Sequence, residues 1–277
     1  MLTYCRRLRR TTRAFRALPF LAFAPAACSA PTGPAFPAEA VQMQPPAVYQ
    51  LWWNAVERCA GTTGDFNAVR FYQDPGQSIV RTNGDSANGY WFRDGNRIVV
   101  GQYRIYDGQL VRHEMLHALI GRTAGDGHPP EYFVQKCGGI VHCAGACLTE
   151  RGPVPTPSLN ATTVDASKMA IDVTIDPAQA DQSKYDGWIT VLVRERNPLA
   201  SSVWVDVPSG VGITIGGVTL GLEPISGGRV GFLPGETHQQ MFDVHLPDLT
   251  FLAAGAYGVR GFFASDTTPP IPVTLQH

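Results

Sequence analysis

Residues 110–121 read LVRHEMLHALIG, and this stretch decides how the first half of the chain is interpreted. Apolar residues run through it at helical spacing and Gly121 is a typical stop signal, so we expect a helix here. His113 and His117 are four residues apart, which places both imidazoles on one face of that helix. Such a pair can bind one zinc ion, and Glu114 beside the first histidine can take a proton from a zinc-bound water.

A third histidine, His128, follows in the segment GDGHPPEY that begins at residue 125. Catalytic zinc sites use three protein ligands and keep one position for water, so a third ligand is expected. His128, Glu131, Glu150 and His142 are the candidates for this ligand. Glu131 equally suits the first turn of a following helix, where the helix dipole favours a carboxylate.

These two segments resemble the SprT-like zinc metallopeptidases, which carry HE-(M/L)-x-H-A followed by G-H-x-P-E-F. The matching stretches here are His113–Ala118 and Gly127–Tyr132, with Pro129 where that group often has Gly and Tyr132 in place of Phe. The resemblance spans about 25 residues of the chain. It implies a zinc peptidase in which His128 is the third ligand.

The N-terminus has the layout of a secretory signal peptide over residues 1–27. Six arginines and no acidic residue occupy the first 16 positions, and a short apolar run follows from Ala17 to Ala27. The sequence Ala-Ala-Cys ending at Cys28 resembles a bacterial lipobox, which implies a lipid on Cys28; cleavage by an ordinary signal peptidase is the alternative. We therefore expect export to a bacterial cell envelope, either lipid-anchored or secreted.

The charge that remains after export argues against nucleic acid as a partner. Without residues 1–27 the chain has 16 basic and 23 acidic residues, a net charge of −7. Nucleic-acid binding depends on Lys and Arg that neutralise phosphates. The expected partners are thus a protein or peptide substrate and, through the lipid, a membrane. A DNA-linked role like that of intracellular SprT-like proteins would require that residues 1–27 are not a signal.

Four cysteines remain beyond Cys28, and an oxidising compartment makes disulfides the default. Four cysteines allow three pairings, which sequence does not resolve. We prefer a bridge from Cys59 to Cys137, tying the first helix to the segment after the zinc site, with a local bridge from Cys143 to Cys147. 

Composition divides the remainder into a tether at 28–46, a zincin-type domain at 47–150, a linker at 151–158 and a β-domain at 159–277. The fold class is therefore α+β. In the zincin-type domain, helical spacing covers 47–59, and short strands are expected at 68–72, 90–93 and 97–101. Asp94-Gly95-Asn96 is typical of a hairpin turn between the last two strands.

The last part shows short alternating segments with Gly and Pro turns, which indicate an antiparallel immunoglobulin-like sandwich. Leu233–Glu236 and Ala254–Tyr257 are similar to bacterial Ig-like domains of the proteinase-inhibitor type. The expected strands are 170–175, 188–194, 203–207, 211–215, 240–246, 257–264 and 271–275.

The sequence as a whole predicts an exported zinc metallopeptidase with a C-terminal β-sandwich. In this interpretation His113, His117 and His128 bind zinc and Glu114 is the general base. Tyr106 and Tyr132 are candidates for stabilising the oxyanion. The alternative is a cell-envelope binding protein that keeps zinc for stability alone.

Overall fold

The structure is a computed structural model that describes residues 35–76, 79–80, 86–121, 127–143, 156–264 and 266–276. These residues belong to one compact unit, Thr32–His277. The fold is mixed α+β and mostly β-sheet, as the sequence predicts. The expected signal peptide, Cys28, Cys147 and Glu150 lie outside the described residues. Over the ranges given above, no helix combines the length and apolar character needed to cross a membrane.

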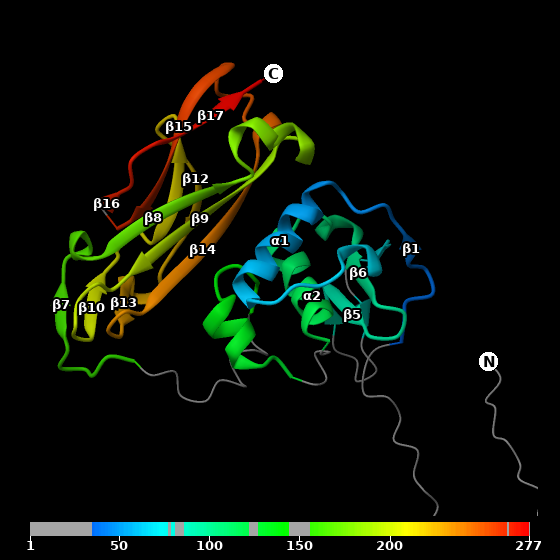
Figure 1. Ribbon diagram of the computed structural model, residues 1–277, viewed down its shortest axis with the longest axis horizontal. Coiled ribbons are helices and arrows are strands. Elements are labelled where there is room, and N and C mark those ends of the chain that lie inside the picture. The colour runs from blue at the N-terminus through cyan, green and yellow to red at the C-terminus, as the bar shows by residue number, and fades with distance from the viewer. Residues whose placement is uncertain are drawn as a thin grey trace, which may run out of the picture. The chain divides into compact units, whose positions relative to one another are not determined.

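The first half of this unit places two helices on one face of a small sheet (Figure 1). Helix α1 spans Val48–Ala60 and α2 spans Gly108–Ile120. The sheet has the order β1-β2-β6-β5, in which β2 and β6 are parallel and the other pairs antiparallel. Its strands are β1 Val41–Gln42, β2 Arg70–Asp74, β5 Gly89–Phe92 and β6 Arg97–Gly101. A separate two-stranded pair joins β3 Ile79–Val80 to β4 Ser86–Ala87.

Both faces of this sheet are covered. Trp52 and Trp53 of α1 are 0% and 2% exposed and belong to the core between helices and sheet. On the opposite face, Phe36 packs edge-on against Tyr72 and Phe92, at ring separations of 5.1 and 5.2 Å. The burial of both faces explains why β5 contains only buried residues instead of an alternating pattern.

The sequence located the strands beside α2 to within two residues. Strand β6 has the predicted bounds, and the turn before it joins β5 to β6 as expected. The strand expected at 68–72 begins instead at Arg70, because Phe66–Ala68 forms a 3₁₀ turn. The carboxylate of Asp65 caps that turn by accepting a hydrogen bond from the Asn67 N–H at 2.9 Å. Strands β1, β3 and β4 were not predicted.

The second half is built from short sheets with the orders β14-β9-β8, β13-β10-β7 and β12-β11-β15, with β16 and β17 also paired to β15. All seven expected strands are present near their predicted positions, whereas β7, β12, β13 and β16 were missed. Strands β7 and β10 are parallel, so the prediction of antiparallel pairing was wrong for this pair. The strands are β7 Thr162–Val164, β8 Ala170–Asp176, β9 Trp188–Arg196, β10 Val203–Asp206, β11 Val211–Ile215, β12 Val218–Glu223, β13 Arg229–Phe232, β14 Thr237–His245, β15 Gly255–Phe263, β16 Asp266–Thr267 and β17 Ile271–Leu275.

Single turns and short segments of 3₁₀ helix connect these elements. They are η1 Phe66–Ala68, η2 Gln102–Arg104, η5 Ala166–Lys168, η6 Gln179–Tyr185, η7 Ser226–Gly228 and η8 Leu246–Asp248. A π-helix, η4, spans Glu131–Lys136 where the sequence predicts a helix after His128.

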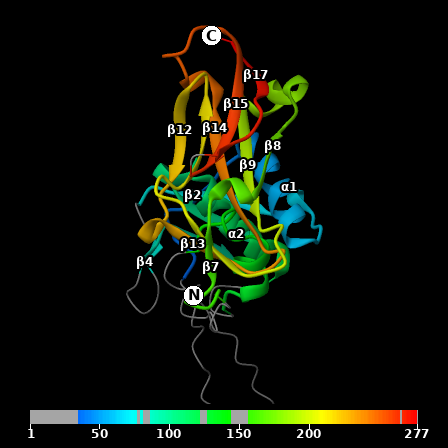
Figure 2. The same cartoon turned by 90° about the vertical axis from the view of Figure 1, so that its left-hand side faces the viewer.

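Strands β9 and β14 have two buried faces, and Figure 2 shows them side by side in the sheet. Val191 and Phe242 belong to the apolar core of the second half. Leu192 and Met241, the next residues along the two strands, belong to the core that contains α1 and α2. Since neighbouring residues of a strand face opposite sides, the sheet β14-β9-β8 contributes to both cores.

Candidate metal site

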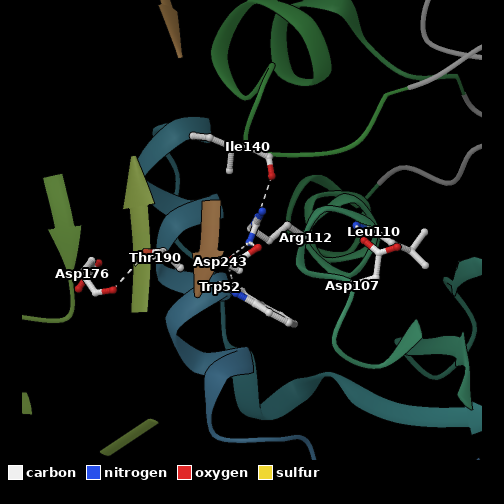
Figure 3. Close-up of polar contacts among 8 residues, drawn as sticks. All are labelled: Trp52, Asp107, Leu110, Arg112, Ile140, Asp176, Thr190 and Asp243. Atoms are coloured by element: carbon white, nitrogen blue, oxygen red, sulfur yellow. Dashed lines mark hydrogen bonds and ion pairs between the residues drawn. The ribbon is translucent and has the colours of Figure 1, made fainter. Parts of the chain in front are cut away.

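Helix α2 carries the HExxH motif and has well-defined ends. The Asp107 carboxylate accepts a hydrogen bond from the Leu110 N–H at 3.1 Å, which caps the first turn (Figure 3). At the other end Gly121 takes a left-handed conformation with φ of 68°, and its N–H donates to the His117 carbonyl. The motif therefore lies inside a regular helix, as the sequence predicts.

Three histidines converge beside this helix. His113 Nε2 lies 3.2 Å from His117 Nε2 and 3.2 Å from His128 Nε2. A tetrahedral zinc site with Zn–N bonds of about 2.0–2.1 Å separates its nitrogens by about 3.3–3.4 Å. The observed separations are close to this value. Among the residues that the structure describes, the histidine triad is the group of His, Cys, Asp or Glu side chains whose spacing suits a metal ion.

The backbone fixes which nitrogen of His113 faces its neighbours. His113 Nδ1 lies 2.5 Å from the carbonyl oxygen of His142, and a carbonyl only accepts hydrogen bonds. Nδ1 therefore carries the proton and donates it, which leaves the lone pair of the neutral ring on Nε2. Metal-binding histidines typically use such an arrangement, in which the second nitrogen is bound to a carbonyl or carboxylate.

The surroundings of His113 favour a neutral imidazole. His117 and His128 are 1% and 5% exposed, while His113 is partly exposed. Burial lowers the pKa of His113 well below its ordinary value, and the nearby rings of His117 and His128 lower it further. The ring thus stays neutral near pH 7, which is the form that binds metals.

Phe133 forms an apolar wall against all three rings. Its side chain is fully buried, and its ring centre lies 5.0, 4.7 and 4.8 Å from those of His113, His117 and His128. It comes from the π-helix η4, a type of turn that is frequent at functional sites. The apolar contact limits solvent access from this side of the triad.

Glu114 is 5% exposed and lies against the first residue of β5. A β-carbon on Gly89 would stand 3.2 Å from Glu114 Cγ and 3.4 Å from its Oε1. The absence of a side chain at Gly89 therefore leaves room for this carboxylate between α2 and the sheet.

The competing ligands lie elsewhere. Glu131 is 59% exposed and forms an ion pair with Lys136 at 2.7 Å. His142 contributes its backbone carbonyl, and its side chain is exposed. The two oxyanion candidates are also engaged with other groups: Tyr106 stacks on Trp188 at 5.5 Å, and the Tyr132 ring lies 4.6 Å from Lys136 Nζ.

A disulfide joins Cys59 to Cys137, which is the pairing preferred from the sequence. It ties the last turn of α1 to the residue that follows η4, and so to the segment that carries Phe133. Cys143 is also disulfide-bonded, and its expected partner Cys147 lies outside the described residues.

Sequence reasoning missed Arg112 and Asp243, which form a buried ion pair between α2 and β14. Two signals were available. Asp243 lies between the apolar residues Phe242 and Val244, and residues 188–193 form a continuous run without charge, which is typical of a sheet buried on both faces.

Comparison of the sequence with models of known protein families and with curated proteins finds no match. The interpretation of the site therefore rests on its own geometry and on the short motif resemblance.

Proposed function

We propose that this chain is an exported zinc-dependent metallopeptidase, with His113, His117 and His128 as the zinc ligands. The observation that carries the proposal is the convergence of three imidazole Nε2 atoms at the spacing of a tetrahedral site. An all-nitrogen donor set also suits zinc better than calcium or magnesium, which prefer oxygen ligands. The residues present therefore fit the metal.

A zinc ion bound by these residues would supply a Lewis acid that lowers the pKa of water to about 7 and polarises a substrate carbonyl. Glu114, which follows the first ligand in the helix, would accept a proton from the attacking water. As the water oxygen bonds to the peptide carbon and the C–N bond breaks, Glu114 would return that proton to the leaving amine. Its burial beside Gly89 limits the number of positions that its carboxylate can take.

Strand β5 offers a surface for the substrate next to Glu114. In the order β1-β2-β6-β5 it is one of the two edge strands of the described sheet, paired with β6. An extended peptide can add to such an edge through main-chain hydrogen bonds, which suits a peptidase acting on unfolded protein.

Export is proposed on two independent grounds. The Cys59–Cys137 disulfide is typical of proteins from an oxidising compartment. The basic and then apolar start of the sequence has the layout of a secretory signal, with Cys28 as the proposed site of lipid attachment. Mass spectrometry of the protein from its native host would test the second ground by showing whether residues 1–27 are absent and Cys28 is modified.

Metal analysis beside a hydrolysis assay tests the proposed function. The wild type should contain one zinc per chain, and alanine at His113, His117 or His128 should remove or severely weaken binding. His142→Ala is a matched control, because it removes a nearby imidazole but keeps the carbonyl that accepts from His113. If Glu131→Ala lost the metal and His128→Ala kept it, then Glu131 and not His128 would be the third ligand.

Glu114→Gln separates catalysis from metal binding. The amide keeps the size of the side chain but removes the base, so zinc should remain while hydrolysis of an unfolded protein falls at least about 10²-fold. A Glu114→Gln protein as active as the wild type would reject the mechanism. A wild type that binds zinc, loses stability without it and hydrolyses nothing would instead support the binding-protein alternative.

A further inference from the structure

Arg112 connects the metal-site helix to the sandwich. It precedes His113 on α2, its side chain is fully buried, and Nη1 donates to both carboxylate oxygens of Asp243 at 2.8 Å (Figure 3). The Asp243 side chain is 13% exposed and also accepts a hydrogen bond from Trp52 Nε1 at 2.9 Å. One carboxylate of β14 therefore holds both helices.

The same arginine holds the segment that orients His113. Arg112 Nε donates to the Ile140 carbonyl at 2.7 Å. Two residues later, the His142 carbonyl accepts from His113 Nδ1, and the His142 N–H donates to the Gln109 carbonyl at 3.1 Å. A continuous series of contacts thus runs from Asp243 through Arg112 and this segment to the ring of the first proposed ligand.

Two glycines allow β14 to approach this closely. A β-carbon at Gly108, the first residue of α2, would collide with Asp243 Oδ2 and Arg112 Nη1. A β-carbon at Gly139 would collide with the carbonyl oxygen of Gln239 on β14. In addition, the Met241 N–H donates to the Gly139 carbonyl at 3.0 Å. The strand is therefore fitted to both the helix and the segment that follows η4.

We propose that Asp243 is a positioning residue for the histidine triad, which makes the sandwich a working part of the metal site. This inference rests on the proposed function and deepens it. A buried ion pair adds little net stability compared with apolar residues of similar size. Groups that orient metal-binding histidines, in contrast, typically change metal affinity by 10–100-fold. The contacts of Asp243 lead to His113 Nδ1, which the His142 carbonyl holds.

Three variants of the full chain test the inference at different points. Asp243→Asn removes the charge that holds Arg112. Arg112→Lys retains a cation for Asp243. Lysine has no donor at the position of Nε, so the hydrogen bond to the Ile140 carbonyl is lost. Gly108→Ala keeps every charge, and since Ala favours helix over Gly, any damage must come from the collision with the Asp243 and Arg112 pair.

Two readouts are measured in each folded variant. The first is affinity for Zn²⁺ or Co²⁺ by chelator competition, which we expect to fall about tenfold or more. The second is the His113 Nδ1 proton, followed by NMR in metal-free protein, which should exchange faster with water as the bond to His142 loosens. This second readout requires neither bound metal nor peptidase activity.

Two controls distinguish positioning from a general loss of stability. Asp172→Asn makes the same chemical change in an exposed ion pair. There, Asp172 on β8 lies 3.2 Å from Arg194 on β9. Val244→Ala weakens the sandwich core beside Asp243 without removing a partner of Arg112. Both controls should keep the affinity and the Nδ1 proton of the wild type.

The inference is overturned if Asp243→Asn and Gly108→Ala fold with unchanged affinity and an unchanged Nδ1 proton. It is also overturned if Val244→Ala lowers the metal affinity as much as Asp243→Asn does when both variants lose the same unfolding free energy. A wild type without peptidase activity would reject the proposed function alone, because the Nδ1 proton still decides whether Asp243 positions His113.

Discussion

Removal of the Cys59–Cys137 disulfide should cost a large part of the free energy of unfolding. The two cysteines are 78 residues apart in sequence. In the chain-entropy model a loop of that length loses about 15 cal/mol/K when it is closed, or about 4.5 kcal/mol at 25 °C. Single domains are typically stable by only about 5–15 kcal/mol, so the Cys59→Ala/Cys137→Ala protein should be close to the threshold of folding.

The assay is urea unfolding of oxidised protein followed by tryptophan fluorescence. A matched control is the Cys143→Ala/Cys147→Ala protein, in which the predicted partners are four residues apart in sequence. The same model gives about 2 kcal/mol for so short a loop, with the same chemical change. The long bridge should therefore cost roughly twice as much as the short one.

The bridge also bears on the site, because Cys137 follows the π-helix that carries Phe133. Metal affinity should fall in the Cys59→Ala/Cys137→Ala protein even at temperatures where it remains folded. Equal losses of stability for the two bridges, or no loss for the long one, would refute the loop-closure reasoning. Unchanged metal affinity in the folded double variant would show that this end of η4 does not support the triad.

Two further predictions concern single carboxylates. Gly89→Ala should leave metal content unchanged but lower kcat/KM for an unfolded protein substrate. The reason is that the added β-carbon would stand 3.2 Å from Glu114 Cγ and press on it. Unchanged kinetics would show that Glu114 has room to move. Burial raises the pKa of Glu195 from 4.5 to about 8, and Asp172 contributes to the increase. The folded state then holds a proton that the unfolded state has lost, so the unfolding free energy should fall between about pH 4.5 and 8, by up to about 1.4 kcal/mol per pH unit. Urea titrations at pH 5 and pH 8 should show this slope in the wild type and not in Glu195→Gln; the same slope in both would contradict it.

Periodicity and turn chemistry were sufficient to locate the main elements. The helix around HExxH, the strand 97–101 and the strands 211–215 and 271–275 appear where their patterns predict them. The Asp94-Gly95-Asn96 turn sets its hairpin because Gly95 and Asn96 adopt the positive φ that the turn requires. These features depend on residues that are neighbours in sequence, so a sequence pattern can predict them.

The missed elements depend on partners distant in sequence. Strand β1 has two exposed residues and exists through its pairing with β2. Strands β12 and β13 lack a clean alternation, because both are partly exposed and gain their order from β11 and β10. For the site, spacing predicted the two helix histidines, and only the short resemblance favoured His128 over Glu131.

The contacts around Arg112 show that the domain boundary predicted from composition does not separate two independent halves. A Pro-rich stretch separates the two halves in sequence, yet Leu192 of β9 and Met241 of β14 complete the core around α1 and α2. Without β14, Arg112 would be a charge inside an apolar core with no carboxylate beside it, which proteins avoid at high cost. The half that carries the histidines therefore depends on the half that follows the linker.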